Sequence, residues 1–428
     1  MKSEQCICLK LFVLSSLMLL LLFGFAAGTA YATNGYFANG YSIESKAMGG
    51  AGVALPQGSL DASMNPASMV FVGKRLDFGL SVFNPNRKYD VKGNPSGFPG
   101  TFGLAPGQVK SDSEWFVVPS VGFNWQLDDK NSLGISIYGN GGMNTDYDER
   151  TFGGSSPTGV DLIQLFIAPT YARKITAHHA IGITPIFAYQ SFESQGLEAF
   201  QFFSNSPSKL TNNGHEGSYG YGARIGYLGE IFPFLNIGAA YQTKIYMSEL
   251  DDYEGLFAEK GDFDIPATWT VGIALKAAEG ITFLADLQRI YYNDVDSIGH
   301  PLLPNLTPGS LGRDNGPGFG WDDITILKFG VQWQSSKDWI WRAGYSIGEQ
   351  PISQSDVLFN ILAPATIKNH ATFGVTKKIG DHQEFKFALM HAFTHSVSGP
   401  NPLEAPGQQT IKLTMDQWEF SLGYAWKF

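Results

Sequence analysis

Four groups of residues have types and spacings that could do chemistry. Gly344-Tyr345-Ser346-Ile347-Gly348 matches the Gly-x-Ser-x-Gly pattern of a nucleophilic serine, which needs a turn between a strand and a helix. His391 and His395 have the spacing of a metal-binding pair on a helix. Gly49-Gly50-Ala51-Gly52 resembles part of a dinucleotide-binding loop, and His178-His179 places two imidazoles next to each other in the chain.

The elements predicted around these residues support none of these activities. Ser346 lies inside a predicted strand, and four residues of strand would separate His391 from His395 by about 13 Å. The glycines follow no strand and lack the third glycine of a dinucleotide site. His178-His179 lies in a short turn, where adjacent side chains point apart. We therefore predict a protein that is not an enzyme, with no catalytic residue, no metal and no cofactor.

The composition excludes other classes of protein. Of 428 residues, 43% are apolar, 14% are aromatic and only 16% are charged, which is too apolar for a disordered chain. The formal net charge of −10 disfavours nucleic-acid binding, because it repels phosphates. Beyond the N-terminal region no stretch approaches the ~18 uninterrupted apolar residues of a membrane helix. The mean hydropathy is nevertheless close to zero, at −0.07, and 50 residues are glycine.

The first 32 residues have the pattern of an export signal. A basic start is followed by the apolar run from Leu11 to Phe25 and by Ala30-Tyr31-Ala32, which supplies small residues for signal peptidase. We predict a signal peptide over residues 1–32 that is cleaved after Ala32; an uncleaved membrane anchor is the alternative. Cleavage would remove Cys6 and Cys8, so the mature chain would have no thiol and no disulfide.

The rest of the chain alternates between large and small side chains with the period of a β-strand. In the last segment, Trp418, Phe420 and Leu422 alternate with Glu419 and Ser421, and the pattern continues to the end of the chain. Residues 219–227 and 339–348 alternate in the same way. Small or charged residues suit the interior of a barrel, whereas a face of aromatic residues suits lipid.

Fourteen such segments are predicted, and the connections between them alternate in length. Short turns alternate with long connections rich in Gly, Pro, Asp and Asn, which is typical of periplasmic turns and extracellular loops. We therefore predict an all-β fold, a transmembrane antiparallel β-barrel, with a secreted sandwich or propeller as the alternative. The predicted strands are residues 74–87, 115–127, 131–145, 162–174, 178–193, 217–228, 235–248, 266–276, 281–293, 323–334, 338–348, 369–379, 383–396 and 410–428.

Residues 33–73 precede the first strand and show no alternation. Their glycine-rich stretch is followed by Asp61-Ala62-Ser63 and then by Asn65, Pro66 and Ala67. This arrangement ahead of a fourteen-stranded barrel resembles the FadL/TodX (OMPP1) family of outer-membrane proteins, which transport long-chain fatty acids and hydrocarbons. The resemblance covers essentially the whole mature chain. It implies that residues 33–73, with Asp61 and the Asn-Pro-Ala motif, form a hatch in the lumen and that residues 74–428 form the barrel.

A glycine cluster in the third strand is the second feature that the resemblance interprets. Gly139, Gly141 and Gly142 lie within four residues, which disfavours a regular ladder. Family members have a kink in this strand that opens the barrel wall, so the resemblance implies that apolar substrate leaves sideways into the membrane. Lateral release avoids returning apolar surface to water, at about 25 cal/mol per Å². The alternative is that the glycines are merely tolerated near a strand end.

Two long loops and three cations are the remaining candidates for substrate contact. The resemblance implies that helical segments in the loops form a capture groove; packing within the loops is the alternative. The groove residues would be Leu197, Phe200, Phe203, Leu256 and Phe257. We expect three arginines to face the lumen, where one could neutralise a fatty acid carboxylate or simply pair with an acidic neighbour. They are Arg173, Arg224 and Arg342.

The function that follows is passive uptake of hydrophobic small molecules, either long-chain fatty acids or aromatic hydrocarbons, across the outer membrane of a Gram-negative bacterium. An outer-membrane barrel hydrolase, or an adhesin with no transport role, is the alternative. The expected partners are the substrate, outer-membrane lipids and lipopolysaccharide, and the barrel assembly machinery, which would read the last strand ending in Phe428. No nucleic acid is expected, and the chain is expected to be a monomer.

Overall fold

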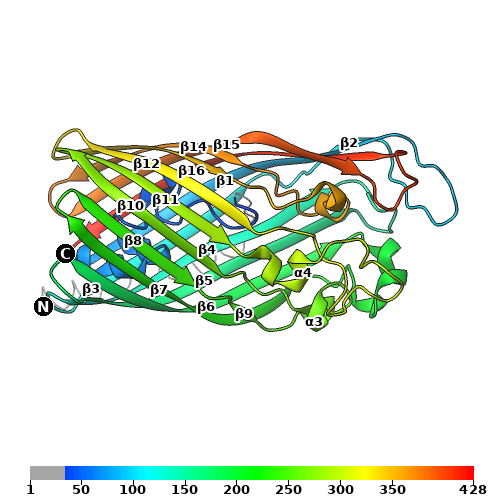
Figure 1. Cartoon of the computed structure of the whole chain (residues 1–428), viewed down its shortest axis with the longest axis horizontal. Coiled ribbons are helices and arrows are strands. Elements are labelled where there is room, and N and C mark those ends of the chain that lie inside the picture. Colours follow the sequence, from blue (N-terminus) through cyan, green and yellow to red (C-terminus); the bar gives the residue numbers. More distant parts are fainter. Residues whose placement is uncertain (1–33) are drawn as a thin grey trace, which may run out of the picture.

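The computed structural model describes residues 34–428 as one antiparallel β-sheet that closes on itself (Figure 1). The sheet has 16 strands, and pairing of the last with the first closes the barrel. β2 and β3 pair in succession with β1, and β8 and β9 pair in succession with β7, so each of these two pairs is one interrupted strand. Sixteen strands less these two continuations leave fourteen, so the predicted all-β, fourteen-stranded barrel is confirmed.

Apart from β2, which lies in the long connection predicted between the first two strands, the observed strands lie where the alternation predicted them. They are β1 (Arg75–Lys92), β2 (Gly107–Lys110), β3 (Phe116–Gln126), β4 (Asn131–Tyr147), β5 (Thr158–Lys174), β6 (His179–Gln195), β7 (Glu216–Phe232), β8 (Leu235–Gln242), β9 (Tyr246–Met247), β10 (Thr268–Ala278), β11 (Ile281–Ile290), β12 (Ile324–Gln334), β13 (Trp339–Gly348), β14 (Asn369–Ile379), β15 (Gln383–Pro400) and β16 (Thr410–Lys427). The main difference is length, because β1 and β15 extend several residues beyond their predicted ends.

The two ends of the barrel differ, as the connection lengths predicted. Short turns and the C-terminus gather at the left of Figure 1, and the long loops gather at the right. We call these the turn end and the loop end. Within each strand, side chains alternate between the two faces of the wall. In β16, Trp418 and Leu422 are exposed on the outer face, whereas Glu419 and Ser421 are buried in the lumen.

The helices are short and lie in the lumen or in the loops. They are α2 (Ile43–Lys46), η1 (Ser59–Ser63), η2 (Pro66–Phe71), η3 (Glu198–Phe203), η4 (Pro207–Lys209), η5 (Asp251–Tyr253), α3 (Ala258–Gly261), η6 (Tyr292–Asp294), α4 (Asp296–Gly299), η7 (Gln354–Asp356) and η8 (Phe359–Ile361). None of the helices found in residues 34–428 combines the length and the apolar composition needed to cross a membrane. The predicted signal peptide, residues 1–32, lies outside the described residues.

Residues 34–73, which we call the N-terminal segment, lie inside the barrel (blue in Figure 1). Glycines in the wall allow the backbone of the segment to approach closely. A Cβ on Gly344 of β13 would lie 2.1 Å from the carbonyl carbon of Met48, and one on Gly182 of β6 would lie 2.5 Å from that of Pro66. The packing of the segment therefore depends on glycine at these wall positions.

The long loops fold back over the loop end and form an apolar core there. Phe200, Tyr253, Trp321 and Phe359 are among its fully or largely buried side chains. In the β13–β14 loop, residues 356–367 are buried without exception. Side chains of β4 hold this loop, because Thr145 and Tyr147 donate hydrogen bonds of 2.8 Å to its backbone carbonyls.

Candidate functional site

The Asn-Pro-Ala motif ties the N-terminal segment to itself and to the barrel wall. Asn65 caps η2, because its side chain accepts a hydrogen bond from the Ala67 amide at 3.1 Å, and Pro66 occupies the first helical position. The Asn65 amide group donates to the carbonyl of Val53 at 2.7 Å and to that of Tyr227 on β7 at 2.9 Å. The side chain of Asn65 therefore links three parts of the chain.

Buried ion pairs join the N-terminal segment to the opposite side of the wall. Lys386 of β15 pairs with Glu44 of α2 and with Asp77 of β1, the latter at 2.6 Å. Arg75 also pairs with Asp77, at 2.7 Å, and Lys46 pairs with Glu419 of β16. Every one of these side chains is more than nine-tenths buried. Removing one partner from such a pair leaves an uncompensated buried charge, which is strongly destabilising.

Asp61 is a further buried carboxyl group in the N-terminal segment. It accepts hydrogen bonds from Ser42 Oγ at 2.9 Å and from the amides of Gln57 and Gly58 at 2.6 and 2.8 Å. Burial, helped by the nearby charge of Glu44, nevertheless raises the pKa of Asp61 from 3.8 to about 6. Its ionisation is therefore linked to the packing of the segment.

We expect the N-terminal segment to pack more tightly as the pH falls through about 6. The raised pKa of Asp61 contributes stability that is fully present below its ordinary pKa of 3.8 and is lost as the pH rises through about 6. Hydrogen-exchange protection of the Gln57 and Gly58 amides, corrected for intrinsic rates, should be about fourfold higher near pH 5.5 than near pH 7.5. Asp61→Asn should abolish the difference, and an undiminished difference in that variant would contradict the assignment.

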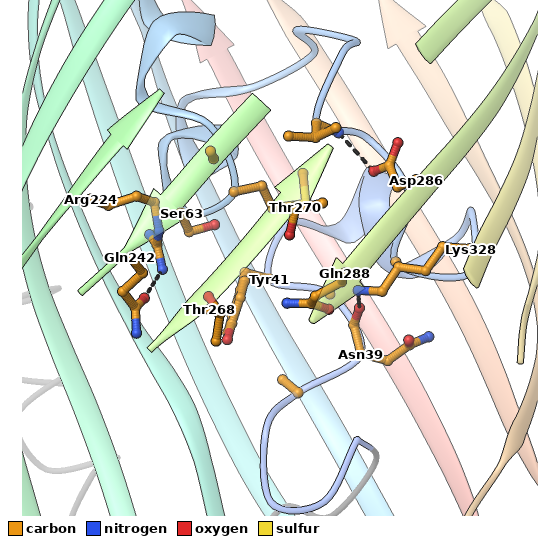
Figure 2. A pocket seen from close by; sticks show the side chains of 16 residues that line it. Asn39, Tyr41, Ser63, Arg224, Gln242, Thr268, Thr270, Asp286, Gln288 and Lys328 are labelled. Carbon is orange, nitrogen blue, oxygen red and sulfur yellow. Dashed lines mark hydrogen bonds between the residues drawn. The ribbon is translucent and has the colours of Figure 1, made fainter. Parts of the chain in front are cut away.

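A polar cavity lies between the N-terminal segment and the wall (Figure 2). Five strands, β7, β8, β10, β11 and β12, contribute to its lining, with Arg224, Gln242, Thr270, Asp286 and Lys328 among the residues. Arg224 donates to Gln242 and, at 2.9 Å, to the hydroxyl of Tyr138. Lys328 Nζ donates to the backbone carbonyl of Asn39 at 3.0 Å. Within residues 34–428 neither cation has a carboxylate at salt-bridge distance.

The cavity is small, and some of the polar atoms that line it have no hydrogen-bond partner. Its volume is about 30 Å³, which is room for one or two water molecules and not for an acyl chain. Asp286 accepts the amides of Gly52 and Val53 through Oδ2, but its Oδ1 has no partner, and neither has Gln242 Nε2. Two buried cations therefore face a polar cavity beside the N-terminal segment, and this cavity is too small for an acyl chain.

The three arginines predicted to face the lumen do not share one site. Arg224 lines the cavity, whereas Arg342 lies elsewhere in the lumen and donates to Gln57, Gln332 and Thr376 at 2.7–3.0 Å. The expectation for Arg173 is wrong, because this residue lies on the outer face of β5, in phase with the exposed Tyr171. Arg173 lies near the turn end of its strand, where a long side chain can reach the aqueous interface.

Lys328 and Asn39 are cavity residues that the sequence reasoning missed. Lys328 carried a usable signal, because it alternates with Leu327 and Phe329 and so takes the inward phase of its strand. Asn39 carried none, since it lies in a segment without periodicity. Its backbone carbonyl holds Lys328, and its side chain accepts a 3.4 Å hydrogen bond from Ser346.

The glycine cluster of β4 lies where the pairing between strands is irregular. The β3–β4 pairing ends at Ser120↔Tyr138, beside Pro119, which has no N–H to donate. On one side, the register of β4 with β5 shifts between Gly139 and Gly141. On the other side, β3 does not pair with Gly142 within the described chain. The N-terminal segment bonds there instead: the Ala38 amide donates to the Asn140 carbonyl at 3.1 Å, and the Gly142 amide to the Tyr36 carbonyl at 3.0 Å.

The five residues expected in a capture groove are mostly interior. Leu197, Phe200 and Phe257 are buried in the loop-end core, and Phe203 and Leu256 are half-buried against it. Phe202, the neighbour that the expectation left out, is 71% exposed. η3 carries Phe200, Phe202 and Phe203, so alternate faces of one short helix serve the core and the surface.

Ser346, which matched the pattern of a nucleophilic serine, has a histidine partner but no triad in the described chain. Ser346 and His370 are hydrogen-bonded at 2.9 Å in the lumen wall, through His370 Nδ1. His370 Nε2 has no hydrogen-bond partner, so no carboxylate in residues 34–428 orients the imidazole as a triad requires. The same part of the chain contains no group of three or more His, Cys, Asp or Glu side chains arranged for a metal.

Comparison with known proteins gives a family and a fold. The family model described as outer membrane protein transport protein (OMPP1/FadL/TodX) matches residues 24–428. No curated protein sequence matches the chain. The Pseudomonas putida toluene transporter TodX is 21% identical, with a TM-score of 0.68 over 92% of this chain and 100% of that one. A Pseudomonas aeruginosa FadL homologue is 16% identical, with a TM-score of 0.69 over 92% and 100%. The Ralstonia pickettii toluene transporter TbuX is 20% identical, with a TM-score of 0.59 over 91% and 99%.

Proposed function

The chain belongs to the OMPP1/FadL/TodX family of outer membrane transport proteins, and on that premise we propose that it is a passive channel for hydrophobic molecules with an anionic head. Long-chain fatty acids are the ligand class that fits. Passage would run from the loop end, taken as the extracellular side, toward the polar cavity. A neutral aromatic hydrocarbon is the second candidate, because the loop-end core is rich in aromatic rings.

The observation that carries the proposal is the pair of buried cations in the cavity. Arg224 and Lys328 face the same space, and neither lies at salt-bridge distance from a carboxylate of the described chain. Asp286 lines the same cavity, so two cations outnumber one carboxylate there, and an entering carboxylate would receive charge-assisted hydrogen bonds from Arg224 and Lys328. The aromatic and aliphatic core above them would hold an apolar tail. A molecule that lacks the carboxylate would gain only the second interaction.

The closed cavity requires a conformational step, for which the N-terminal segment is the proposed hatch. The segment contributes Asn39, Tyr41 and Met64 to the cavity lining, so its movement would enlarge the space. We propose that substrate is first held at the loop surface around Phe202, Phe203 and Leu256, which are the accessible members of that region. The hatch would then shift and admit the carboxylate to its site.

Lateral release between β3 and β4 is the proposed last step. The backbone groups of Asn140 and Gly142 bond to the N-terminal segment, so the element that closes the cavity also covers this irregular part of the wall. Movement of the segment would open both together. The apolar tail would then enter the membrane without re-exposure to water.

Uptake by a deletion strain carrying the gene on a plasmid tests the function. We expect the wild type to restore uptake of oleate. Arg224→Gln should lower oleate uptake about tenfold, because charge-assisted hydrogen bonds contribute ~1.5–3 kcal/mol, and should leave uptake of an alkylbenzene unchanged. Lys337→Met, at an exposed turn residue, is the matched control. Failure of the wild type to transport any apolar substrate would favour a barrel hydrolase or adhesin instead.

Two partner assignments belong to the same proposal. The last strand, β16, ends beside Phe428, whose ring is 60% exposed on the barrel surface, so the barrel assembly machinery could reach it. Closure of the sheet by β1–β16 pairing leaves the wall of one chain complete, which supports a monomer.

A further inference from the structure

A second irregular seam lies in the wall, between β5 and β6. These strands pair in one register from Gly159↔Gln195 to Ile167↔Phe187 and resume at Tyr171↔Ile183. Between these pairs the register places Pro169 directly opposite Pro185, and the pairing lapses. Neither proline has an N–H, so the two ladder hydrogen bonds that such a pair can exchange cannot form.

Each proline remains paired on its other side. Pro169 pairs with Ile135 of β4, and Pro185 pairs with Ala223 of β7. The lapse is therefore confined to the seam between β5 and β6. Proline is ordinarily excluded from interior strands, and a missing backbone hydrogen bond is expensive where the wall faces hydrocarbon. Because the two facing prolines cannot exchange ladder hydrogen bonds, β5 and β6 meet at this seam like two unpaired sheet edges, although the barrel as a whole is closed.

The lumen side of the seam is held by small groups and covered by the N-terminal segment. The Thr170 and Thr184 hydroxyls form a 2.8 Å hydrogen bond across it. Just toward the turn end, Gly182 lies against Pro66, whose carbonyl carbon would be 2.5 Å from a Cβ at that glycine. Helix η2 therefore covers the wall next to the seam, and its movement would expose the seam to the lumen.

The outer side of the seam borders an apolar hollow in the barrel surface, which we call the outer hollow. Its volume is about 760 Å³. The lining includes Tyr171 of β5, Ile183 of β6, Ile225 of β7 and Trp269 of β10, and Arg173 stands among these apolar residues. The size is that of a small-molecule site, and the single guanidinium offers an anionic head a partner near the turn end.

We propose that the β5–β6 seam at Pro169 and Pro185 is a second lateral exit and that the outer hollow receives the departing substrate, its tail against the apolar lining and its carboxylate at Arg173. This inference rests on the proposed uptake function. In this proposal Arg173, which lies on the outer face of β5 and not in the lumen, binds the substrate there. The seam and the hollow adjoin through Tyr171 and Ile183, the first pair beyond the lapse.

A reversible clamp tests the exit. Residues 34–428 contain no cysteine, so Pro169→Cys with Pro185→Cys introduces the only thiols there. Their disulfide would join the seam, and we expect oxidation to lower oleate uptake about twofold, with recovery on reduction, because these strands can no longer part while the β3–β4 exit stays open. The matched control is Leu287→Cys with Leu327→Cys, which face each other across the regular β11–β12 pair. Oxidation of the control should leave uptake unchanged.

A second variant does not depend on disulfide formation. Pro169→Val with Pro185→Val restores both N–H groups, so the hydrogen-bond ladder between β5 and β6 can form without interruption. The strands should then part less readily, and oleate uptake should fall below that of the wild type. Uptake equal to wild type in the valine variant and in the oxidised clamp, with both barrels folded by heat-modifiable electrophoresis, would overturn the exit. Absence of uptake by the wild type itself would overturn the proposed function instead, so the two failures are distinguishable.

Discussion

Lys386→Met is expected to release the N-terminal segment from the barrel wall. The substitution removes the partner of Glu44 and leaves that carboxylate buried without an ion pair, while Asp77 keeps Arg75. Loss of one partner from a buried pair costs about 3–5 kcal/mol, which corresponds to a shift of ~10² or more in the docking equilibrium. Hydrogen-exchange protection of residues 43–47 should fall accordingly, and the conductance of the purified barrel in planar bilayers should rise.

Two further variants separate undocking from general damage. Glu44→Gln with Lys386→Met removes the orphaned charge and should recover much of the protection, because the cost lies in the unpaired carboxylate. Lys337→Met, at an exposed lysine, should change neither protection nor conductance. Normal protection of residues 43–47 in Lys386→Met would show that the ion pairs do not hold the segment in place.

Gly141→Ala is expected to open the irregular part of β4 with a single methyl group. A Cβ at Gly141 would lie 1.8 Å from the carbonyl oxygen of Tyr36, so the N-terminal segment must move away. The backbone hydrogen bonds made by Ala38 and Gly142 would be lost, at about 1–3 kcal/mol for each buried group left unsatisfied. We expect conductance and oleate uptake to rise about tenfold.

Gly348→Ala is the matched control for this substitution. Gly348 also lies in a strand, and the nearest atom to its Cβ would be a side-chain carbon of Ile326 at 3.1 Å, with no atom of the N-terminal segment among its nearest neighbours. It should leave conductance unchanged. If the Ala38 amide exchanges faster in Gly141→Ala while conductance stays at the wild-type value, the segment does not close this part of the wall.

The barrel was predictable because its signal is local. Each strand alternates between lipid and lumen, so a window of about ten residues suffices to reveal it, as the alternation around Phe420 did for β16. Whether a residue faces the lumen or the lipid was predicted wrongly where this alternation is weaker. Arg173 shares its phase with Tyr171, yet a charged residue on the outer face is tolerated near the turn end, where the side chain reaches water.

The candidate site was predictable only in part. Arg224 was found because a cation in the inward phase of an apolar strand stands out, and Lys328 could have been found by the same rule. The capture residues were less predictable. Phe200 and Phe202 are the same residue type two positions apart, but Phe200 faces the loop-end core and Phe202 faces the surface. A short helix without periodicity does not encode which side its loop will fold toward.

The sequence by itself determined the barrel and its strand count, because the alternation of side chains responds to the surroundings of each strand separately. It also determined which end carries the loops, because the lengths of the connections alternate along the chain. Only the tertiary structure decided which charged side chains in the lumen form ion pairs and which line the cavity. Lys386 meets Glu44 from more than three hundred residues away, whereas Arg224 and Lys328 converge with Asp286 on one cavity and form no salt bridge within the described chain. Pairing across a lumen depends on distances between residues remote in sequence, and these distances are not encoded in the pattern of any single strand.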